Sequence, residues 1–400
     1  MTRVFIDRKK ILILFGTRPE VIKFAPIVKE LKAQSQYFQT VTVSTGQHTD
    51  LLKPFLKIFD IRPDFDLNVM SANQTPSDVC AKVMSAMDKI LAEEKPDVVL
   101  VQGDTSSALA GAMAAFHRKI PVGHVEAGLR SGNPLSPFPE EMNRRLISQV
   151  AKFHFAATDH NCETLISEGF DPENIFVTGN PVVDSLRSIL RDFEPGEAIK
   201  SLLAETDGLK RVLLTTHRRE SFGEVMAGNL TALRHFVEKH EDICLFFPVH
   251  PNPAVREAAR AVLSEHPRIY LIDPLDYADF IHVLANAWLI VSDSGGVQEE
   301  APSLGKPLLV LRENTERPEA LWSGVARLVG NDPAEFARML EENYDDTGDD
   351  SWIASVKKVA NPFGDGTAAE KIAGILKNTL FYESFSNGAE TLEFETAAAL

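Results

Sequence analysis

Few cysteines and no long apolar segment are the first features of this 400-residue sequence. Its three cysteines, Cys80, Cys162 and Cys244, lie far apart and form no C-x-x-C pair. A disulfide framework or a zinc knuckle is therefore not expected, and the cysteines are typical of buried apolar positions in a reducing compartment. The apolar run near the start, ILILF at 11–15, is too short for a signal-peptide core or a membrane span. We therefore expect a soluble, cytoplasmic protein.

Basic residues are also too few for a large polyanionic partner. The chain has 41 lysines and arginines against 57 aspartates and glutamates, which gives a formal net charge of -16. Nucleic acids and anionic membranes bind concentrated basic faces, so neither partner is expected. A small anionic ligand remains compatible with this balance if a few cations gather in one cleft.

Several common catalytic and cofactor motifs are missing as well. The sequence contains no G-x-S-x-G and no P-loop, and GTRPE stands after the first apolar run in place of G-x-G-x-x-G. No H-x-H or H-x-x-x-H spacing is present to suggest a metal site. The sequence therefore predicts neither a metal nor an organic cofactor.

Short apolar runs, each followed by a longer helical pattern, fill most of the chain. In the first half the runs are ILILF, TVTVS, DVVLV, PVGHV, FHFAA and NIFV, and in the second RVLLT, CLFFP, IYLI, WLIV, PLLV and ARLV. This rhythm is typical of parallel sheets with helices on both faces. With 400 residues, the chain predicts an α/β protein of two doubly wound, Rossmann-like domains facing a central cleft.

The break between the domains is expected near Asn180 and Pro181, which interrupt the pattern. We expect one domain over residues 1–180 and a second over 181–365, with a helix over 366–381 that packs back on the first. The tail, residues 382–400, has no clear periodicity and is expected to be disordered.

The unusual polar residues follow the apolar runs, where strands of parallel sheets end. Ligands of open α/β sheets bind beyond these carboxyl ends. If both domains turn them toward one cleft, the residues that line it are Arg18, Asp104, Glu126, His217, His250 and Ser294.

The stretch SDSGGVQEE (292–300) sets two glycines and a serine beside a pair of glutamates. Free amides at the start of a helix attract anions, whereas glutamates repel them. A nucleotide diphosphate sugar reconciles the two, because its phosphates can take the amides while a carboxylate one turn further accepts from ribose hydroxyls. The simpler alternative is a helix start whose acids complement the helix dipole.

Other charged residues also allow two interpretations. Arg18 and Lys23, just after the first strand, can meet a phosphate or pair with an acid. Asp104 can serve a ligand or cap the helix that begins at Thr105 or Ser106. Glu126 at the end of a central strand is costly to bury without a partner, which favours a functional role.

A second group of candidates shows the same ambiguity. Glu140 and Arg144 are i, i+4 neighbours and can be no more than a surface pair. His217 and His250, at neighbouring strand ends, can each be structural. Because they stand opposite several carboxylates, we favour acid/base work at neutral pH.

With these residues assembled, the chain from about Ile11 to Leu376 resembles the non-hydrolysing UDP-N-acetylglucosamine 2-epimerases, which have a GT-B fold. The motifs that carry the resemblance are GTRPEVIKFAP, QGDT, GHVEAGLRSG, SPFPEEMNR, TGNPVVDSL, THRRESFG, PVHPNP, SDSGGVQEEAPSLGKP, ENTERPEA and NPFGDG. The resemblance implies interconversion of UDP-GlcNAc and UDP-ManNAc through 2-acetamidoglucal, a UDP-binding second domain, a homodimer and a role in polysaccharide biosynthesis.

The resemblance also implies roles for individual residues. Asp104, Glu126, Glu140 and His217 would supply acid/base and sugar-contacting groups, with Arg144 nearby, without any assignment to a face of the sugar. The implied substrate-binding residues are Arg18, Lys23, His250, Phe280, Ser294, Gly295, Gly296, Glu300 and Arg317. Among them, Arg18, Lys23, Arg317 and the glycine amides would meet the diphosphate, Glu300 the ribose and Phe280 the uracil.

Some bacterial members of this family bind a second UDP-GlcNAc as an activator. Gln47 and His48 match the residues implied there, but Thr49 and Asp50 depart from the family's H-R-x-M pattern, and Asn73 replaces an arginine. Losing a cation and gaining an acid should weaken an anionic activator. We therefore expect weak or absent activation.

Rival interpretations stay open on the sequence alone. They are a hydrolysing 2-epimerase that releases ManNAc and UDP, a 2-epimerase of a modified UDP-acetamido sugar, a GT-B glycosyltransferase, and a sugar-nucleotide-binding regulator without chemistry.

Overall fold

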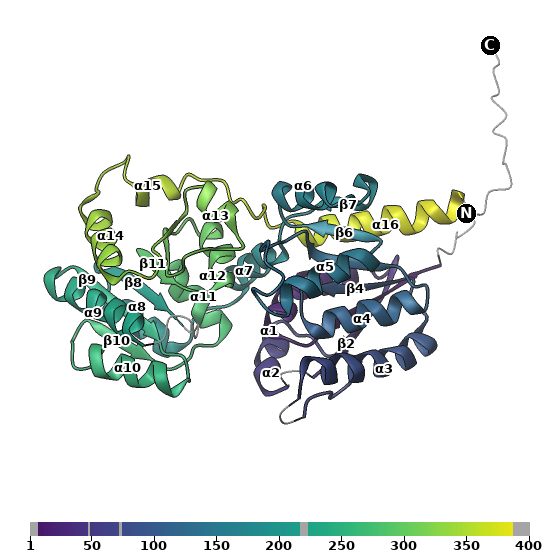
Figure 1. The fold of residues 1–400 in the computed structure, drawn as a ribbon, viewed down its shortest axis with the longest axis horizontal. Coiled ribbons are helices and arrows are strands. Elements are labelled where there is room, and N and C mark those ends of the chain that lie inside the picture. The colour runs from purple at the N-terminus through teal and green to yellow at the C-terminus, as the bar shows by residue number, and fades with distance from the viewer. Residues whose placement is uncertain (1–6, 47–48, 72–73, 217–222, 387–400) are drawn as a thin grey trace, which may run out of the picture.

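The computed structural model describes residues 7–46, 49–71, 74–216 and 223–386, and it contains two parallel sheets side by side along the long axis (Figure 1). The first sheet has the strand order β3-β2-β1-β4-β5-β6-β7, and the second β10-β9-β8-β11-β12-β13. In both sheets the order reverses beside the first strand, which creates the switch point where doubly wound folds bind ligands. The predicted α/β class with two Rossmann-like sheets is therefore confirmed.

The first sheet and its helices come from the first half of the chain. Its strands are β1 (Lys9–Phe15), β2 (Phe38–Ser44), β3 (Phe65–Asp66), β4 (Val98–Gln102), β5 (Val122–Ala127), β6 (Phe153–Ala156) and β7 (Ile175–Val177). The helices are α1 (Arg18–Ala33), α2 (Thr49–Ile58), α3 (Pro76–Glu94), α4 (Ser106–His117), α5 (Glu140–Val150) and α6 (Asp159–Ser167), with a 3-10 turn, η1 (Pro172–Asn174).

The second sheet and the remaining helices follow. Its strands are β8 (Lys210–Thr215), β9 (Ile243–Pro248), β10 (Ile269–Ile272), β11 (Leu289–Ser292), β12 (Leu308–Val310) and β13 (Ala326–Leu328). The helices are α7 (Pro181–Asp192), α8 (Glu197–Glu205), α9 (Glu224–Lys239), α10 (Pro253–Leu263), α11 (Tyr277–Ala285), α12 (Gly295–Ser303), α13 (Pro318–Trp322), α14 (Pro333–Asp345), α15 (Trp352–Val356) and α16 (Ala368–Ser386).

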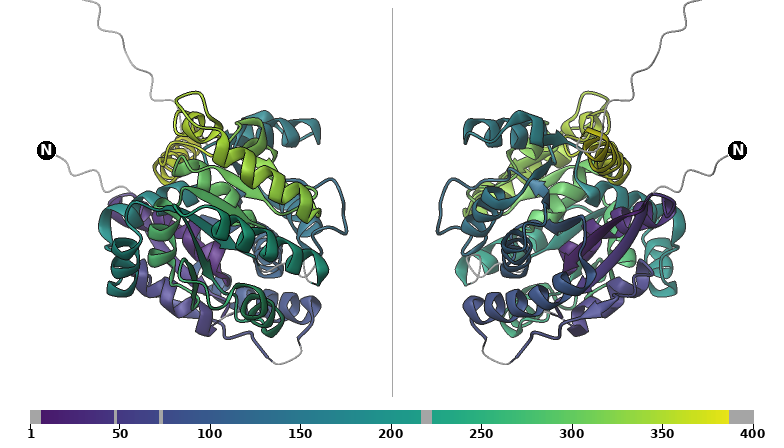
Figure 2. Two further views of the ribbon diagram at one scale, coloured as in Figure 1. Left: turned by 90° about the vertical axis from the view of Figure 1, so that its left-hand side faces the viewer. Right: turned by 90° about the vertical axis from the view of Figure 1, so that its right-hand side faces the viewer.

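The continuous apolar runs arise because each central strand is buried on both faces (Figure 2). In β1, Ile11 and Ile13 pack in the core formed with α1 and α16, whereas Leu12 and Leu14 pack toward α3 and α4. Successive side chains of a strand point to opposite faces, so a strand between two helix layers needs apolar residues at every position. The same alternation in β8 divides the core of the second sheet.

All twelve predicted strands are present, and two differences were not foreseen. A seventh strand in the first sheet, β3, has only two residues, too short to produce an apolar run. The last helix extends to Ser386 rather than ending at residue 381, so the expectation of a wholly disordered tail is wrong for its first five residues. No glycine or proline lies between Gly374, within this helix, and Gly388 to stop it earlier. Residues 387–400 lie outside the described residues.

The chain passes between the two sheets at two adjacent points. On its way from the first sheet to the second, the chain passes through Asn180. The backbone N–H of Asn180 donates to the carbonyl of Phe363, on the segment that returns to the first sheet, at 2.8 Å. After the return, α16 packs on the core of the first sheet through apolar residues that include Ile372 and Leu376 (Figure 1). No helix in the described part of the chain is both long and apolar enough to cross a membrane.

Candidate active site

Glu126 occupies a strained position at the carboxyl end of β5. Its φ is +64°, in the left-handed region that residues with a Cβ seldom adopt, and the pairing of β5 with β6 shifts register between Val125 and Ala127. A conformation of this kind costs on the order of 1–3 kcal/mol and persists only where surrounding contacts enforce it. Glu126 is the extra residue at this shift in register, and it is only 8% exposed.

Three nitrogen donors surround the Glu126 carboxylate. The Lys23 ammonium, from α1, donates to Oε1, and the Gln102 side chain, from the end of β4, donates to Oε2. Asn180 Nδ2 reaches Oε1 from the crossing between the sheets at 3.1 Å. A buried carboxylate with this many donors is held in one orientation.

From Lys23 a line of alternating charges continues into the second sheet's domain. Lys23 Nζ lies 3.0 Å from Glu299 Oε2, Glu299 Oε1 accepts from Arg317 Nε at 2.6 Å, and Arg317 Nη1 donates to Glu316 at 2.8 Å. The Lys23–Glu299 contact lacks hydrogen-bond geometry, and no described residue donates to Glu299 Oε2. Both cations are thus balanced by carboxylates, which is the second of the two interpretations considered for Lys23.

Burial and charge oppose one another along this line. Burial acts to raise the pKa of Glu126, but the charges of Lys23 and Arg317 outweigh it and hold that pKa below its ordinary value. Burial likewise acts to lower the pKa of Lys23, and Glu126 and Glu299 reverse the effect and raise it. Glu126 and Lys23 are therefore both ionised at neutral pH.

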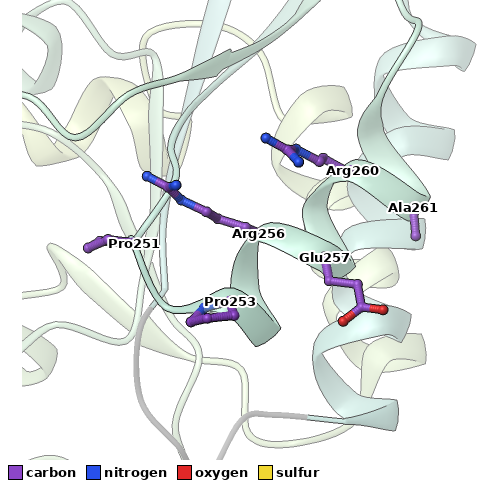
Figure 3. Close-up of a pocket in the computed structure, with 6 residues that line it drawn as sticks. All are labelled: Pro251, Pro253, Arg256, Glu257, Arg260 and Ala261. Carbon is purple, nitrogen blue, oxygen red and sulfur yellow. The ribbon is translucent and has the colours of Figure 1, made fainter.

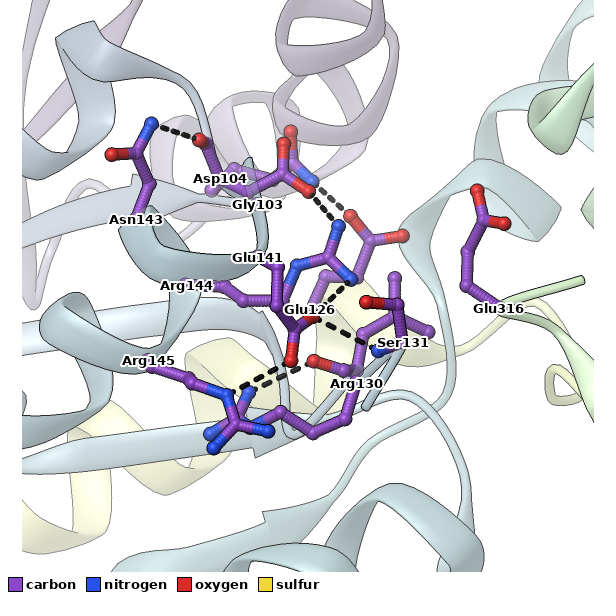
Figure 4. A network of polar contacts seen from close by, with 12 residues as sticks. Gly103, Asp104, Glu126, Arg130, Ser131, Glu141, Asn143, Arg144, Arg145 and Glu316 are labelled. Carbon is purple, nitrogen blue, oxygen red and sulfur yellow. Dashed lines mark hydrogen bonds and ion pairs between the residues drawn. The ribbon is translucent and has the colours of Figure 1, made fainter. Parts of the chain in front are cut away.

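Asp104 follows β4, the strand that pairs with β5, and it does not cap α4. Thr105 is the capping residue, since its side chain accepts from Ala108 N at 3.0 Å. The Asp104 carboxylate instead accepts from Arg144 Nη2 at 2.5 Å, as Figure 4 shows. Arg144 is 4% exposed and also lies 3.4 Å from Glu141, so it is not the surface partner of Glu140 that its spacing allowed.

Glu140 is the first residue of α5 and lines a pocket of about 340 Å³ together with Thr17, Thr105 and Asn143. No described residue donates a hydrogen bond or forms an ion pair with its carboxylate, which is half-buried. Asn143, on the same helix, donates to the Asp104 carbonyl at 2.8 Å. The pocket therefore joins Glu140 to the strand end that carries Asp104.

The glycine-rich stretch forms the predicted helix start. Ser294 is at the N-cap position of α12, and Gly295 and Gly296 are its first two residues. A Cβ on Gly295 would lie 2.8 Å from Arg317 Nη1, so only glycine leaves room for the guanidinium at this end of the helix. The free amides of the first turn of α12 and the Arg317 guanidinium therefore lie side by side.

Glu300 is a buried residue further along α12. It is 6% exposed and accepts from the Tyr277 hydroxyl at 3.1 Å. Burial raises the pKa of its carboxyl to about 7, and the Tyr277 hydrogen bond opposes the shift. The Tyr277 ring also packs on Phe55 and Phe59 from the α2 region, which joins the two domains beside this carboxylate.

Of the remaining predicted residues, the structure describes Arg18, Phe280 and His250. Arg18 is exposed at the start of α1, with its guanidinium 5.9 Å from the Phe55 ring centre. Phe280 is half-buried on α11, and His250 accepts from Asn252 N at 3.2 Å after β9. His217, Gln47 and His48 lie outside the described residues, as does Asn73.

A hollow of about 630 Å³ lies beside the loop after β9 that also carries His250. It is lined by Pro251, Pro253, Arg256, Glu257, Arg260 and Ala261 at the start of α10 (Figure 3). Its charged side chains are exposed, and none is buried against a partner. Size alone does not make it the site, because no oriented polar group converges there.

The site also contains three residues that the sequence analysis did not single out. Gln102, Asn180 and Glu299 all contact the predicted residues directly. Glu299 adjoins the predicted Glu300, and Asn180 was named only as a domain break. Their signal was their position at strand ends and helix starts, which marks many residues without function.

Two parallel doubly wound sheets with buried polar groups meeting between their carboxyl ends define a GT-B-like α/β enzyme class. The family model described as UDP-N-acetylglucosamine 2-epimerase matches residues 29–377. A UDP-N-acetylglucosamine 2-epimerase of Escherichia coli strain K12 is 44% identical over 374 residues, or 92% of this chain and 98% of that protein. The chain therefore belongs to the UDP-N-acetylglucosamine 2-epimerase family and is an enzyme.

Solved structures agree with this assignment. The UDP-GlcNAc 2-epimerase of Neisseria meningitidis bound to UDP-GlcNAc is 38% identical, with a TM-score of 0.83 over 92% of this chain and 99% of that one. The Methanocaldococcus jannaschii UDP-GlcNAc 2-epimerase, in complex with UDP-GlcNAc and UDP, is 34% identical, with a TM-score of 0.75 over 92% and 99%.

Proposed function

We propose that this chain interconverts UDP-GlcNAc and UDP-ManNAc by elimination and readdition of UDP. In the forward step the C2–H bond breaks and a carboxylate takes the proton. The C1–O bond breaks with its electron pair going to the diphosphate, and a C1–C2 double bond forms in 2-acetamidoglucal. Protonation of C2 from the opposite face and return of UDP to C1 complete the inversion.

The observation that carries this proposal is the buried line from Glu126 through Lys23 and Glu299 to Arg317. It sets a candidate base beside the Lys23 cation, and it connects both to the Arg317 guanidinium at the start of α12. Abstraction of a C–H proton needs an oriented, desolvated base, and departure of UDP needs positive charge on the leaving oxygens. Both needs are supplied within one contact network.

The diphosphate would also change the base. When Lys23 and Arg317 turn to the phosphates, their charge is shared with a new anion and stabilises the Glu126 carboxylate less. The pKa of Glu126 then rises toward the range in which a carboxylate is a better proton acceptor. We propose that Asp104, His217 and Glu140, which lines the adjoining pocket, supply the other acid/base and sugar contacts, with Arg144 holding Asp104.

For the nucleotide we propose the second sheet's domain. Ser294, Gly295, Gly296 and Arg317 would hold the diphosphate with Lys23 and Arg18. Glu300 would accept from the ribose hydroxyls, and Phe280 would flank the uracil, with His250 nearby. The support is the helix start of α12 and the carboxylate one turn beyond it.

Incubation with UDP-GlcNAc in deuterium oxide, followed by proton NMR, tests the reaction. Loss of the C2 proton signal together with appearance of UDP-ManNAc is the expected result. Free ManNAc would indicate hydrolysis instead. No change with either UDP-sugar would overturn the proposed substrate and favour a modified UDP-acetamido sugar.

We further infer that residues 1–180 and 181–365 form the two domains, with residues 366–381 returning to the first. The paired crossing at Asn180 and Phe363 and the packing of α16 on the first sheet support this division.

A homodimer is our proposal for the assembly. Met142 and Leu146 are four residues apart on α5 and are 37% and 45% exposed, and Leu135 and Phe138 just before the helix are 73% and 67% exposed. An apolar strip of this kind suits a second copy of the chain.

Light scattering after gel filtration tests the assembly. Leu146→Glu should convert the dimer to a monomer, because it would place a charge in the interface. Ile166→Glu, at a 45% exposed position on α6, is the matched control and should leave the dimer intact. A monomeric wild-type protein, or a dimer that Leu146→Glu does not weaken, would contradict the proposal.

A further inference from the structure

Asn180 connects the crossing between the sheets to the Glu126 carboxylate. Its backbone N–H donates to Phe363 O at 2.8 Å, its side-chain Oδ1 accepts from Val182 N at 3.1 Å, and its Nδ2 donates to Glu126 Oε1 at 3.1 Å. The residue is 2% exposed. One side chain therefore caps α7 and contacts the candidate base at the same time.

The crossing brings the two linking segments into direct backbone contact. Gly179 and Gly364 have φ values of +87° and +112°, and a Cβ on Gly364 would lie 2.9 Å from the Gly179 Cα. Because only glycine fits, the segments meet at one fixed place. Any change in the angle between the two sheets would therefore alter the backbone conformation next to Asn180.

Helix α7 follows directly and lies between the domains. It packs against α1 and α16 on one side and against α11 and α12 on the other. Asn180 caps its first turn, so a shift of α7 relative to β5 would change the distance between the Asn180 amide and Glu126. The contact is thus sensitive to the arrangement of the two domains.

We propose that Asn180 is a positioning residue that ties the orientation and proton affinity of the Glu126 carboxylate to the arrangement of the two sheets. Its effect on turnover rests on the proposed function, whereas its effect on Glu126 does not. Asn180 forms no hydrogen bond with the residues that we assign to the nucleotide.

The charges around Glu126 come from three other elements. Lys23 approaches from α1, Arg317 from the residue before α13, and Asp104 from the turn after β4. Substitution of Asn180 leaves all of them in place. A neutral donor to a carboxylate favours its ionised form, so loss of that donor should raise the pKa of Glu126.

Two substitutions separate this role from helix capping. Serine and aspartate both cap helices as well as asparagine does. Serine at this position is too short to reach Glu126, and aspartate reaches it without donating a hydrogen bond. Asn180→Ser should lower kcat about tenfold, the effect of one hydrogen bond to a charged group, because a carboxylate that is free to turn away from the C2 proton loses more in orientation than its raised pKa gains in basicity. Asn180→Asp should lower it further, because it adds a like charge.

The pH dependence and ligand affinity provide the diagnostic readouts. The acidic limb of the pH profile of kcat/KM should move to higher pH in Asn180→Ser and further in Asn180→Asp. UDP affinity should stay within about twofold, since Asn180 does not contact the proposed nucleotide site. Asn161→Ser is the matched control, because Asn161 is also a buried asparagine whose amide contacts a carboxylate, Glu319, from the other domain.

Titration of the labelled glutamate carboxyls by carbon-13 NMR tests the inference without turnover. Absence of one resonance in Glu126→Gln assigns the signal of Glu126. We expect its midpoint to rise in both Asn180 variants and not in Asn161→Ser. An unchanged midpoint would overturn the role of Asn180, even if the variants lose thermal stability. A shifted midpoint in a protein that does not exchange the C2 proton would refute the proposed function alone.

Discussion

The two sheets share one topology and carry different chemistry at the same edge. Beyond the strands of the first sheet stand carboxylates held by fixed donors, with Glu126 as the central example. Beyond the second stand a glycine-rich helix start and the Arg317 guanidinium. The difference teaches that a doubly wound sheet specifies where a ligand lies, while the residues after each strand specify what is done to it.

The connection between these regions is a single line of charges. Lys23 belongs to the first sheet's side yet pairs with Glu299 of the second. The division into a region for proton transfer and a region for binding is our proposal, and substitutions on each side can separate the two.

The largest effect is expected for Glu126→Gln, on the first side. Loss of a general base should reduce turnover about 100- to 10,000-fold. UDP affinity should change by less than about threefold, because Lys23 keeps Glu299 as a partner. Steady-state assays and calorimetry measure the two quantities, and Glu257→Gln, in the exposed hollow of Figure 3, is the control. Equal losses of UDP binding and turnover would contradict the proposed division into a region for proton transfer and a region for binding.

A smaller effect of the opposite kind is expected for Arg317→Gln, on the second side. Removal of a charged donor to the diphosphate should weaken UDP binding about 10- to 100-fold. Calorimetric titration with UDP measures the loss, and Arg256→Gln, an exposed arginine on α10, should change it little. An unaltered UDP affinity would remove Arg317 from the proposed phosphate site.

A change in stability, rather than in binding or turnover, is expected for Glu300 as pH changes. Because its pKa is raised to about 7, the folded protein binds a proton there that the unfolded chain releases above about 4.5. The free energy of unfolding should therefore fall as pH rises through this window and level off above 7, by on the order of 3 kcal/mol from this group. Glu300→Gln should abolish that part of the slope.

Denaturant titrations at pH 5, 6, 7 and 8 measure this slope in both proteins. The wild type should lose stability relative to Glu300→Gln as pH increases. Parallel curves would show that the folded Glu300 carboxyl titrates at its ordinary pKa. Glu257→Gln serves again as the exposed control.

The apolar runs predicted the strands because burial on both faces forces continuous hydrophobicity. The two-residue β3 has no such run, and its pairing depends on distant β2. The helix start at Gly295 was predictable from local chemistry. The left-handed backbone at Glu126 was not, because a shift in register between two strands leaves no mark on a single sequence.

Partners across the domains were the hardest to predict. For Lys23 the sequence allowed a phosphate or an acid, and only the approach of α12 identifies Glu299 as its partner. Asn180 looked like a simple break in the pattern because two of its three contacts, with Glu126 and Phe363, involve residues far away in the chain. Long-range contacts of this kind depend on the assembled fold.

Because the chain returns to the first sheet after Phe363, the residues between Asn180 and Phe363 form one continuous insertion in the unit built on the first sheet. Its two ends meet at a 2.8 Å hydrogen bond, and α16 completes the surrounding unit (Figure 1). An insert with adjoining ends can be replaced without pulling its host apart. If the second sheet's domain binds the nucleotide, as we propose, this fold can acquire a new nucleotide preference by exchange of one continuous segment of gene, while the part that carries the proposed catalytic carboxylates stays unaltered.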